Sequence, residues 1–113
     1  DRQHFDVVVE GMRRVVYEPG GTGHRAQLKD IVICGKTGTV QNPHGEDHST
    51  FIAFAPMDKP KIAIVVFIEN AKGGGGLWAA PTAGLMIEKY LTRKVTEIDR
   101  EKTIMEATFT YKD

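Results

Sequence analysis

The sequence predicts an α+β domain in which an antiparallel three-stranded sheet is flanked by helices. Two segments carry apolar side chains at helical spacing, three segments between them have strand composition, and a short turn joins the last two strands. With 113 residues, 41% of them hydrophobic, the chain has the size of one small domain and enough apolar residues for a core. We expect one domain over residues 1–93 and a charged C-terminal tail over residues 94–113.

The first helix is predicted near the N-terminus, where apolar residues recur at helical spacing. They are Phe5, Val8, Val9, Met12, Val15 and Val16. Acidic residues lie early in this segment and Arg13 and Arg14 lie late, an order that suits the helix dipole. The run Pro19-Gly20-Gly21 ends the helix. The polar stretch 22–29 is expected to be a connection that includes a helical turn.

Three strands are predicted next. The first runs from Asp30 to Val40 and the second from Thr50 to Ala55, with a polar loop between them. The stretch from Ile62 to Ile68 contains seven consecutive apolar residues, which predicts a third strand buried on both of its faces. Because only a short turn separates this strand from the second, the two are expected to pair antiparallel.

A second helix is predicted after the glycine run 73–76, which is expected to be mobile. The helix opens at Ala79-Ala80-Pro81, with the proline near the first turn, where its missing N–H costs little. Its apolar stripe comprises Ala83, Met86, Ile87, Tyr90 and Leu91. Residues 108–111 alternate as in a strand, but a tail is the preferred interpretation.

Composition excludes several classes of function. The chain has 15 Lys and Arg residues and 15 Asp and Glu residues, so its zero net charge gives no general attraction to nucleic acid or anionic lipid. A single cysteine, Cys34, excludes an internal disulfide. No apolar run reaches the length of a membrane span and no signal-peptide pattern is present. Because the chain starts at Asp1 without a methionine, we expect a piece of a longer protein.

The most informative stretch is Gly-Lys-Thr-Gly-Thr at residues 35–39, within the first predicted strand. Lys36 supplies a positive charge, and Thr37 and Thr39 supply short hydrogen-bond donors. Gly38 lets a ligand approach the backbone closely. This combination on a strand predicts a site for an anionic substrate.

A phosphate-binding P-loop is the first alternative for this stretch. That motif requires a glycine at position 30, which is Asp30 here, and a helix after the lysine. Strand residues precede Lys36, and Pro43 and Gly45 follow too soon for a long helix. The P-loop interpretation is therefore disfavoured.

Other candidate sites are weaker. His44 and His48 lie in an acidic loop, but their spacing is not that of a zinc motif, so a solvated loop is preferred and no metal or cofactor is predicted. Cys34 has apolar strand neighbours, which favours packing over nucleophilic reactivity. Trp78 and Phe67 are interpreted as core or half-buried residues rather than ligand-stacking residues.

A longer series of motifs surrounds the Lys-Thr-Gly stretch. In order, they are Gly11-Met12 with Val15-Val16, Gly21-Thr22-Gly23, Gly35 to Gln41, His48 with Phe51 to Pro56, Pro60 to Ala63, Glu69-Asn70 before the glycine run, and Ala79-Ala80-Pro81. This order resembles the C-terminal part of the transpeptidase domain of class B penicillin-binding proteins, especially the elongation-type members. The resemblance covers residues 5–92 and implies a fragment of the penicillin-binding-protein and serine β-lactamase-like fold.

The resemblance implies a bacterial D,D-transpeptidase that cross-links peptidoglycan stem peptides by serine acyl transfer and is acylated by β-lactams. It implies catalytic roles for Lys36 and Thr39, and substrate contacts for Thr37, Gly38 and Thr39. It places the nucleophilic serine and its lysine upstream of Asp1. The parent protein is then expected in the inner membrane, with this domain in the periplasm and with a glycosyltransferase and elongation-complex proteins as partners.

Ser49 is the only serine of the chain, and the position three residues later is Ile52 rather than a lysine. No Ser-x-Asn triplet occurs either, so the chain alone is predicted to be inactive. A non-catalytic binding or assembly domain of the same fold is the alternative. Self-association of the fragment is also expected, because the resemblance assigns the apolar strand 62–68 a neighbour that this chain lacks.

Overall fold

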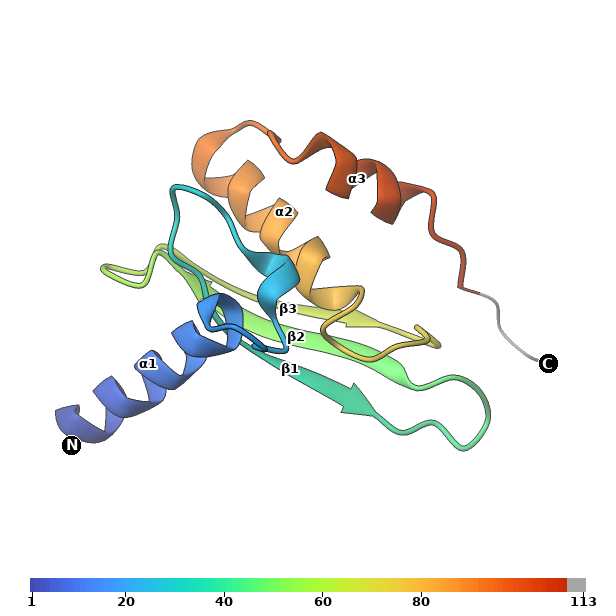
Figure 1. Cartoon of the computed structure of the whole chain (residues 1–113), viewed down its shortest axis with the longest axis horizontal. Coiled ribbons are helices and arrows are strands. Elements are labelled where there is room, and N and C mark those ends of the chain that lie inside the picture. The colour runs from blue at the N-terminus through green and yellow to red at the C-terminus, as the bar shows by residue number, and fades with distance from the viewer. Residues whose placement is uncertain (110–113) are drawn as a thin grey trace.

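The computed structural model describes residues 1–109 (Figure 1). The helical elements are α1 (Arg2–Tyr17), the short 3₁₀ helix η1 (His24–Ala26), α2 (Ala79–Thr92) and α3 (Ile98–Met105). The strands are β1 (Cys34–Val40), β2 (His48–Ala55) and β3 (Ile62–Ile68).

The strands form one sheet in the order β1-β2-β3, and both neighbouring pairs are antiparallel. Helix α2 lies across one face of the sheet, where it packs on β2 and β3, while α1 packs against β1 and extends beyond the sheet (Figure 1). The predicted α+β fold, with an antiparallel three-stranded sheet flanked by helices, is confirmed.

The core lies between α2 and the middle of the sheet. Along β2 the residues Ser49, Phe51, Ala53 and Ala55 are buried, whereas Ile52, on the opposite face, is 47% exposed. The Phe51 ring packs directly against the backbone of Gly35 on β1, where a Cβ atom would overlap with the ring. The core side chains are Val16, Ala26, Leu28, Ile33, Phe51, Ala53, Ala55, Ala79, Ala80, Ala83 and Ile87.

The first strand begins later than predicted, at Cys34 rather than Asp30. The reason is the hydroxyl of Tyr17, near the end of α1. It donates to the carbonyl oxygen of Ile31 at 2.8 Å and accepts from the backbone N–H of Ile33 at 3.1 Å. The segment before β1 is therefore bonded to α1, and its backbone bond toward the second strand comes from beyond the end of β2, where the N–H of Met57 donates to the carbonyl oxygen of Val32 at 2.9 Å.

The prediction that the third strand is buried on both faces is wrong for the described residues. Half-buried and exposed residues alternate along β3, and Val65 is 71% and Phe67 50% exposed. Only the face that contacts α2 is covered. The seven apolar residues could not indicate this, because a run without alternation is compatible with either arrangement.

The charged segment after α2 contains an element that the sequence did not predict. The segment that connects α2 to the next helix is held by Glu88. Its buried carboxylate accepts from the backbone N–H of Thr96 at 2.8 Å and from the Thr96 hydroxyl at 2.6 Å. Helix α3 follows. The division into a domain over 1–93 and a tail over 94–113 stays a prediction, and the alternating segment 108–111 lies partly outside the described residues.

None of the helices formed by residues 1–109 is long and apolar enough to cross a membrane.

Candidate functional site

The Lys-Thr-Gly stretch lies on β1, at the edge of the sheet. In the register, Lys36 is opposite Ile52 and Thr37 is opposite Phe51. Directly opposite residues of an antiparallel pair share a face of the sheet. Lys36 therefore points to the face of the sheet that α2 does not cover, and Thr37 points to the face that α2 covers. The motif presents groups on both sides of one strand edge.

Lys36 is exposed and only locally bonded. Its Nζ atom donates to the carbonyl oxygen of Thr37 at 2.8 Å. The ion pairs within residues 1–109 join Glu10 with Arg13 and Arg14, and none involves Lys36. The ammonium group is therefore available to an anionic ligand beside the sheet edge.

Thr37 is paired with a residue that the sequence did not mark as part of the site. Its Oγ1 atom lies 2.8 Å from Oγ1 of Thr22, which follows the turn after α1. The backbone N–H of Gly23 donates to the carbonyl oxygen of Val15 at 2.9 Å, so this turn is folded back on α1. Thr22 belongs to one of the motifs of the family resemblance, but only the folded chain brings its hydroxyl to Thr37.

The glycine run 73–76, expected to be mobile, packs against the covered face of β1. A Cβ atom on Gly75 would overlap with the carbonyl oxygen of Thr50 and would lie 2.5 Å from that of Gly38. A Cβ atom on Gly74 would lie 2.6 Å from Oγ1 of Thr39. These approaches are possible only without side chains, so the run backs the strand at Gly38 and Thr39.

Ser49 is fully buried and joins this run to α2. Its Oγ atom donates to the carbonyl oxygen of Gly74 at 2.7 Å and accepts from the backbone N–H of Ala79 at 3.2 Å. Both functions of the hydroxyl are therefore used inside the protein. Ser49 has the environment of a structural residue, as expected for a serine that is not the nucleophile.

The loop between β1 and β2 and the first residue of β2 are bonded to the turn that follows β3. Nδ1 of His48 accepts from the backbone N–H of Asn70 at 3.0 Å, and Nδ2 of Asn42 donates to Oδ1 of Asn70 at 2.7 Å. Within residues 1–109 no group of three or more His, Cys, Asp or Glu side chains is placed to hold a metal ion. The loop residues serve hydrogen bonding within the fold.

Cys34, at the start of β1, is buried. Burial raises the pKa of its thiol, and the charge of Arg13 opposes that shift only in part. A thiol of this kind is mostly protonated near neutral pH and is a poor nucleophile. The structure thus agrees with a packing role for Cys34.

These features define a class of site. An edge strand offers backbone groups to an extended chain, an ammonium group without an ion pair among residues 1–109 attracts an anionic end, and hydroxyls flank the same strand. The sequence profile described as the penicillin binding protein transpeptidase domain matches residues 1–88. The chain therefore belongs to the penicillin-binding protein transpeptidase family.

A curated relative supports this assignment. The chain is 33% identical over 112 residues to the peptidoglycan D,D-transpeptidase MrdA of Haemophilus influenzae. The match covers 85% of this chain and 17% of that protein. The chain therefore spans only a small part of the relative's length.

Solved structures have the same fold. A crystal structure of Pseudomonas aeruginosa PBP2 in complex with WCK 5153 matches with a TM-score of 0.72 and 35% identity, over 81% of this chain and 20% of that one. The Helicobacter pylori PBP2 in a complex with MreC matches with a TM-score of 0.61 and 32% identity, over 79% of this chain and 18% of that one.

Proposed function

We propose that this chain is the C-terminal part of a transpeptidase domain in a bacterial peptidoglycan D,D-transpeptidase. The enzyme cross-links stem peptides by serine acyl transfer and is acylated by β-lactams. The observation that carries the proposal is the exposed Lys36 on an edge strand, next to Thr37, Gly38 and Thr39, which forms no ion pair within residues 1–109. The nucleophilic serine comes from residues outside this chain, because Ser49 is buried and bonded.

The stem peptide binds as an added strand along the free edge of β1. Backbone hydrogen bonds then supply affinity, and side chains beside the edge supply specificity. Gly38 permits close approach of the substrate to the strand. A β-lactam binds at the same edge, since it too carries a carboxylate beside its reactive carbonyl group.

Lys36 attracts the terminal carboxylate of the peptide and supports proton movement near the serine. The hydroxyls of Thr37 and Thr39 donate to that carboxylate from the other side of the strand. The backbone N–H of Thr39 donates to the oxyanion of the tetrahedral intermediate, a contact worth about 3–4 kcal/mol in hydrolases. The hydrogen bond between Thr22 and Thr37 supports these roles, because it fixes one hydroxyl in place.

The rest of the domain covers the open face of the sheet beside Lys36. Ile52, Val65 and Phe67 are 47%, 71% and 50% exposed on this face. An apolar surface of this kind marks an interaction site. A covering segment there would bring its own side chains next to Lys36, which is where the serine is required.

The parent protein is proposed to be anchored in the inner membrane, with this domain in the periplasm. Its partners are a glycosyltransferase and elongation-complex proteins. The H. pylori PBP2 complex with MreC supports the second part, because that relative shares the fold and 32% of its aligned residues with this chain.

The test is Lys36→Ala in the full-length parent protein. We expect the second-order rate of acylation by a fluorescent penicillin to fall roughly 10- to 150-fold, which corresponds to about 1.5–3 kcal/mol for one charge-assisted contact. The melting temperature should hardly change, because Lys36 is exposed.

Lys61→Ala is the matched control, since Lys61 is also exposed but lies directly before β3, away from the Lys-Thr-Gly strand. An acylation rate that Lys36→Ala leaves at the control level would contradict the proposed role. It would favour a non-catalytic binding domain of the same fold, as would a parent protein that penicillin does not acylate at all.

A further inference from the structure

We propose that residues 96–109, called the C-terminal strap, position the two loops that back the Lys-Thr-Gly strand. One loop is the turn that carries Thr22 and leads into η1, and the other is the glycine run 73–76. The effect on catalysis rests on the proposed function, whereas the effect on the loops does not. The family profile ends at residue 88, so the strap lies beyond the part of the domain that the profile matches.

The first anchor of the strap is Arg100 on α3. Its Nη2 atom donates to the carbonyl oxygen of Gln27, at the end of η1, at 2.7 Å. Its Nη1 atom lies against α2, so that a Cβ atom on Gly84 would be 2.7 Å away. The same Cβ atom would be 2.6 Å from the carbonyl oxygen of Ala26. The guanidinium group therefore joins α3, α2 and η1 at one point.

The second anchor is Phe109. Its ring meets the Trp78 ring edge to face, with centroids 5.3 Å apart and an interplanar angle of 84°. Nε1 of Trp78 donates to the carbonyl oxygen of Lys72 at 3.1 Å. Trp78 thus links the residues on either side of the glycine run 73–76. Phe109 of the strap packs against the same Trp78 ring.

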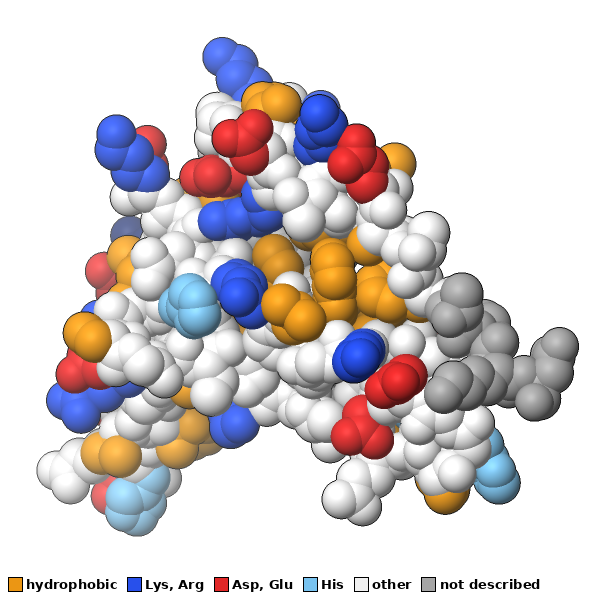
Figure 2. Space-filling model, turned by 45° about the vertical axis from the view of Figure 1, so that its right-hand side comes forward, with side chains coloured by type: hydrophobic (Ala, Val, Ile, Leu, Met, Phe, Trp, Pro, Cys, Tyr) orange, Lys and Arg blue, Asp and Glu red, His pale blue; other side chains and the backbone are white. Residues whose placement is uncertain are grey.

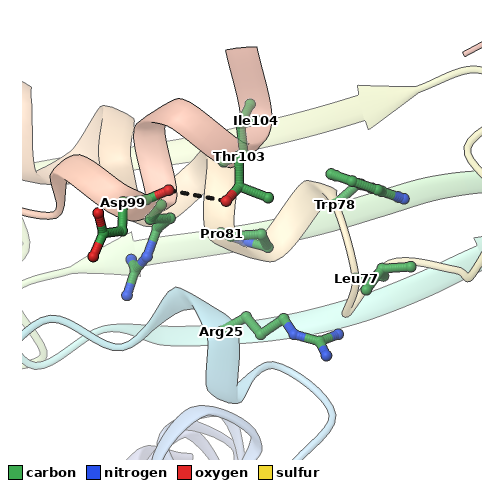
Figure 3. Close-up of a pocket in the computed structure, with 8 residues that line it drawn as sticks. Arg25, Leu77, Trp78, Pro81, Asp99, Thr103 and Ile104 are labelled. Atoms are coloured by element: carbon green, nitrogen blue, oxygen red, sulfur yellow. Dashed lines mark hydrogen bonds between the residues drawn. The ribbon is translucent and has the colours of Figure 1, made fainter. Parts of the chain in front are cut away.

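Between the anchors the strap is incompletely packed. A pocket of about 440 Å³ separates α3 from η1 and the start of α2, with Leu77, Trp78, Pro81, Ile104 and Arg25 in its lining (Figure 3). Figure 2 shows apolar side chains gathered in a hollow below α3. Because this interface is open, the two anchors and the Glu88 contacts carry much of the attachment.

The two loops also contact each other and the motif. A Cβ atom on Gly76 would overlap with the carbonyl oxygen of Thr22, so the loops touch at this point. From there, Thr22 reaches Thr37 and Gly74 reaches Thr39. Because the loops touch each other, a shift of either one would change the surroundings of the Thr37 and Thr39 hydroxyls. Arg100 and Trp78 are therefore positioning residues.

The experiment uses Arg100→Met in the full-length parent, with Lys102→Met as control, because Lys102 is an exposed residue of the same helix. Amide hydrogen exchange is measured by mass spectrometry, and penicillin acylation is measured on the same samples. We expect faster exchange in residues 22–27 and 73–78 but not in β2 or β3. Acylation should fall roughly 2- to 30-fold, the range for coupling through packed contacts. Arg100→Lys, which can still donate to Gln27, should recover part of the loss.

Phe109→Ala tests the second anchor independently, with Met105→Ala as control, since Met105 is 79% exposed. Faster exchange in the glycine run alone supports the strap. Exchange that stays at the control level in both loops, or that rises equally throughout the sheet, overturns it.

Acylation that is unchanged while both loops exchange faster overturns the positioning role. If Lys36→Ala also fails to affect acylation, the proposed function has failed. The exchange data then still decide whether the strap holds the loops.

Discussion

Ser49 occupies the point where β2, the glycine run and α2 meet. Its hydroxyl satisfies the carbonyl oxygen of Gly74 and the backbone N–H of Ala79, and both contacts are buried. A buried polar group without a partner costs about 1–3 kcal/mol. The Ser49 side chain therefore helps to hold the glycine run 73–76 against the Lys-Thr-Gly strand.

Ser49→Ala is expected to destabilise the domain by about 1–3 kcal/mol, because it leaves the buried backbone N–H of Ala79 without a partner. The carbonyl oxygen of Gly74 loses one of its two donors and keeps the backbone N–H of Leu77. Thermal unfolding of the full-length parent would measure the loss. Thr50→Ala, at the next position and on the opposite face of β2, is the control. A variant of Ser49 as stable as this control would show that water or backbone movement replaces the serine contacts.

Single residues differ in how far the sequence reveals them. Lys36 was found because a lysine between glycine and threonine on a strand has few structural reasons to occur there. Thr22 and Ser49 were not found as site residues, because their contacts join positions 15 and 25 residues apart. The roles assigned to Lys36, Thr37, Gly38 and Thr39 stay predictions.

At the scale of elements, the local sequence pattern predicted the bounds of a helix or strand where one local feature specifies them. The bounds of β3 and the start of α2 agree with the prediction, since an apolar run and a proline in the first turn specify them. The start of β1 did not agree, because the Tyr17 hydroxyl competes with the sheet for the segment before it. Helix α3 was missed, since it has no buried residue and depends on Arg100 and Glu88 contacts.

Strand β3 is the second edge of the sheet within residues 1–109, and its outer face is apolar at Val65 and Phe67. An apolar edge strand is a template for pairing with another strand. We therefore expect the isolated 113-residue chain to dimerise, which sedimentation equilibrium over a concentration series would detect. Val65→Pro, which removes a backbone donor without adding charge, should weaken the dimer. A monomer at high concentration would show that this edge needs no neighbour.

At the scale of the whole molecule, the chain carries one side of a proposed active site. The isolated chain is expected to form no covalent adduct with penicillin, because its one serine is buried and hydrogen-bonded. Intact-mass spectrometry after incubation with a fluorescent penicillin measures this. A stoichiometric adduct on Ser49 or Thr37 would refute the assignment of the nucleophile to another part of the parent protein.

The two edge strands of the described sheet, β1 and β3, differ in how they would bind an added strand. An apolar edge strand such as β3 binds an added strand by burying side chains, which favours lasting aggregation. The β1 edge has only glycine, hydroxyl and ammonium groups at residues 35–39, so its hold on a peptide depends on backbone bonds and one charge. In the proposed reaction, the carboxylate that Lys36 is proposed to attract leaves with the terminal D-alanine, while the rest of the peptide stays covalently bound to the serine. After the acyl group has been transferred, only backbone hydrogen bonds would hold the cross-linked product at this edge, and it could dissociate.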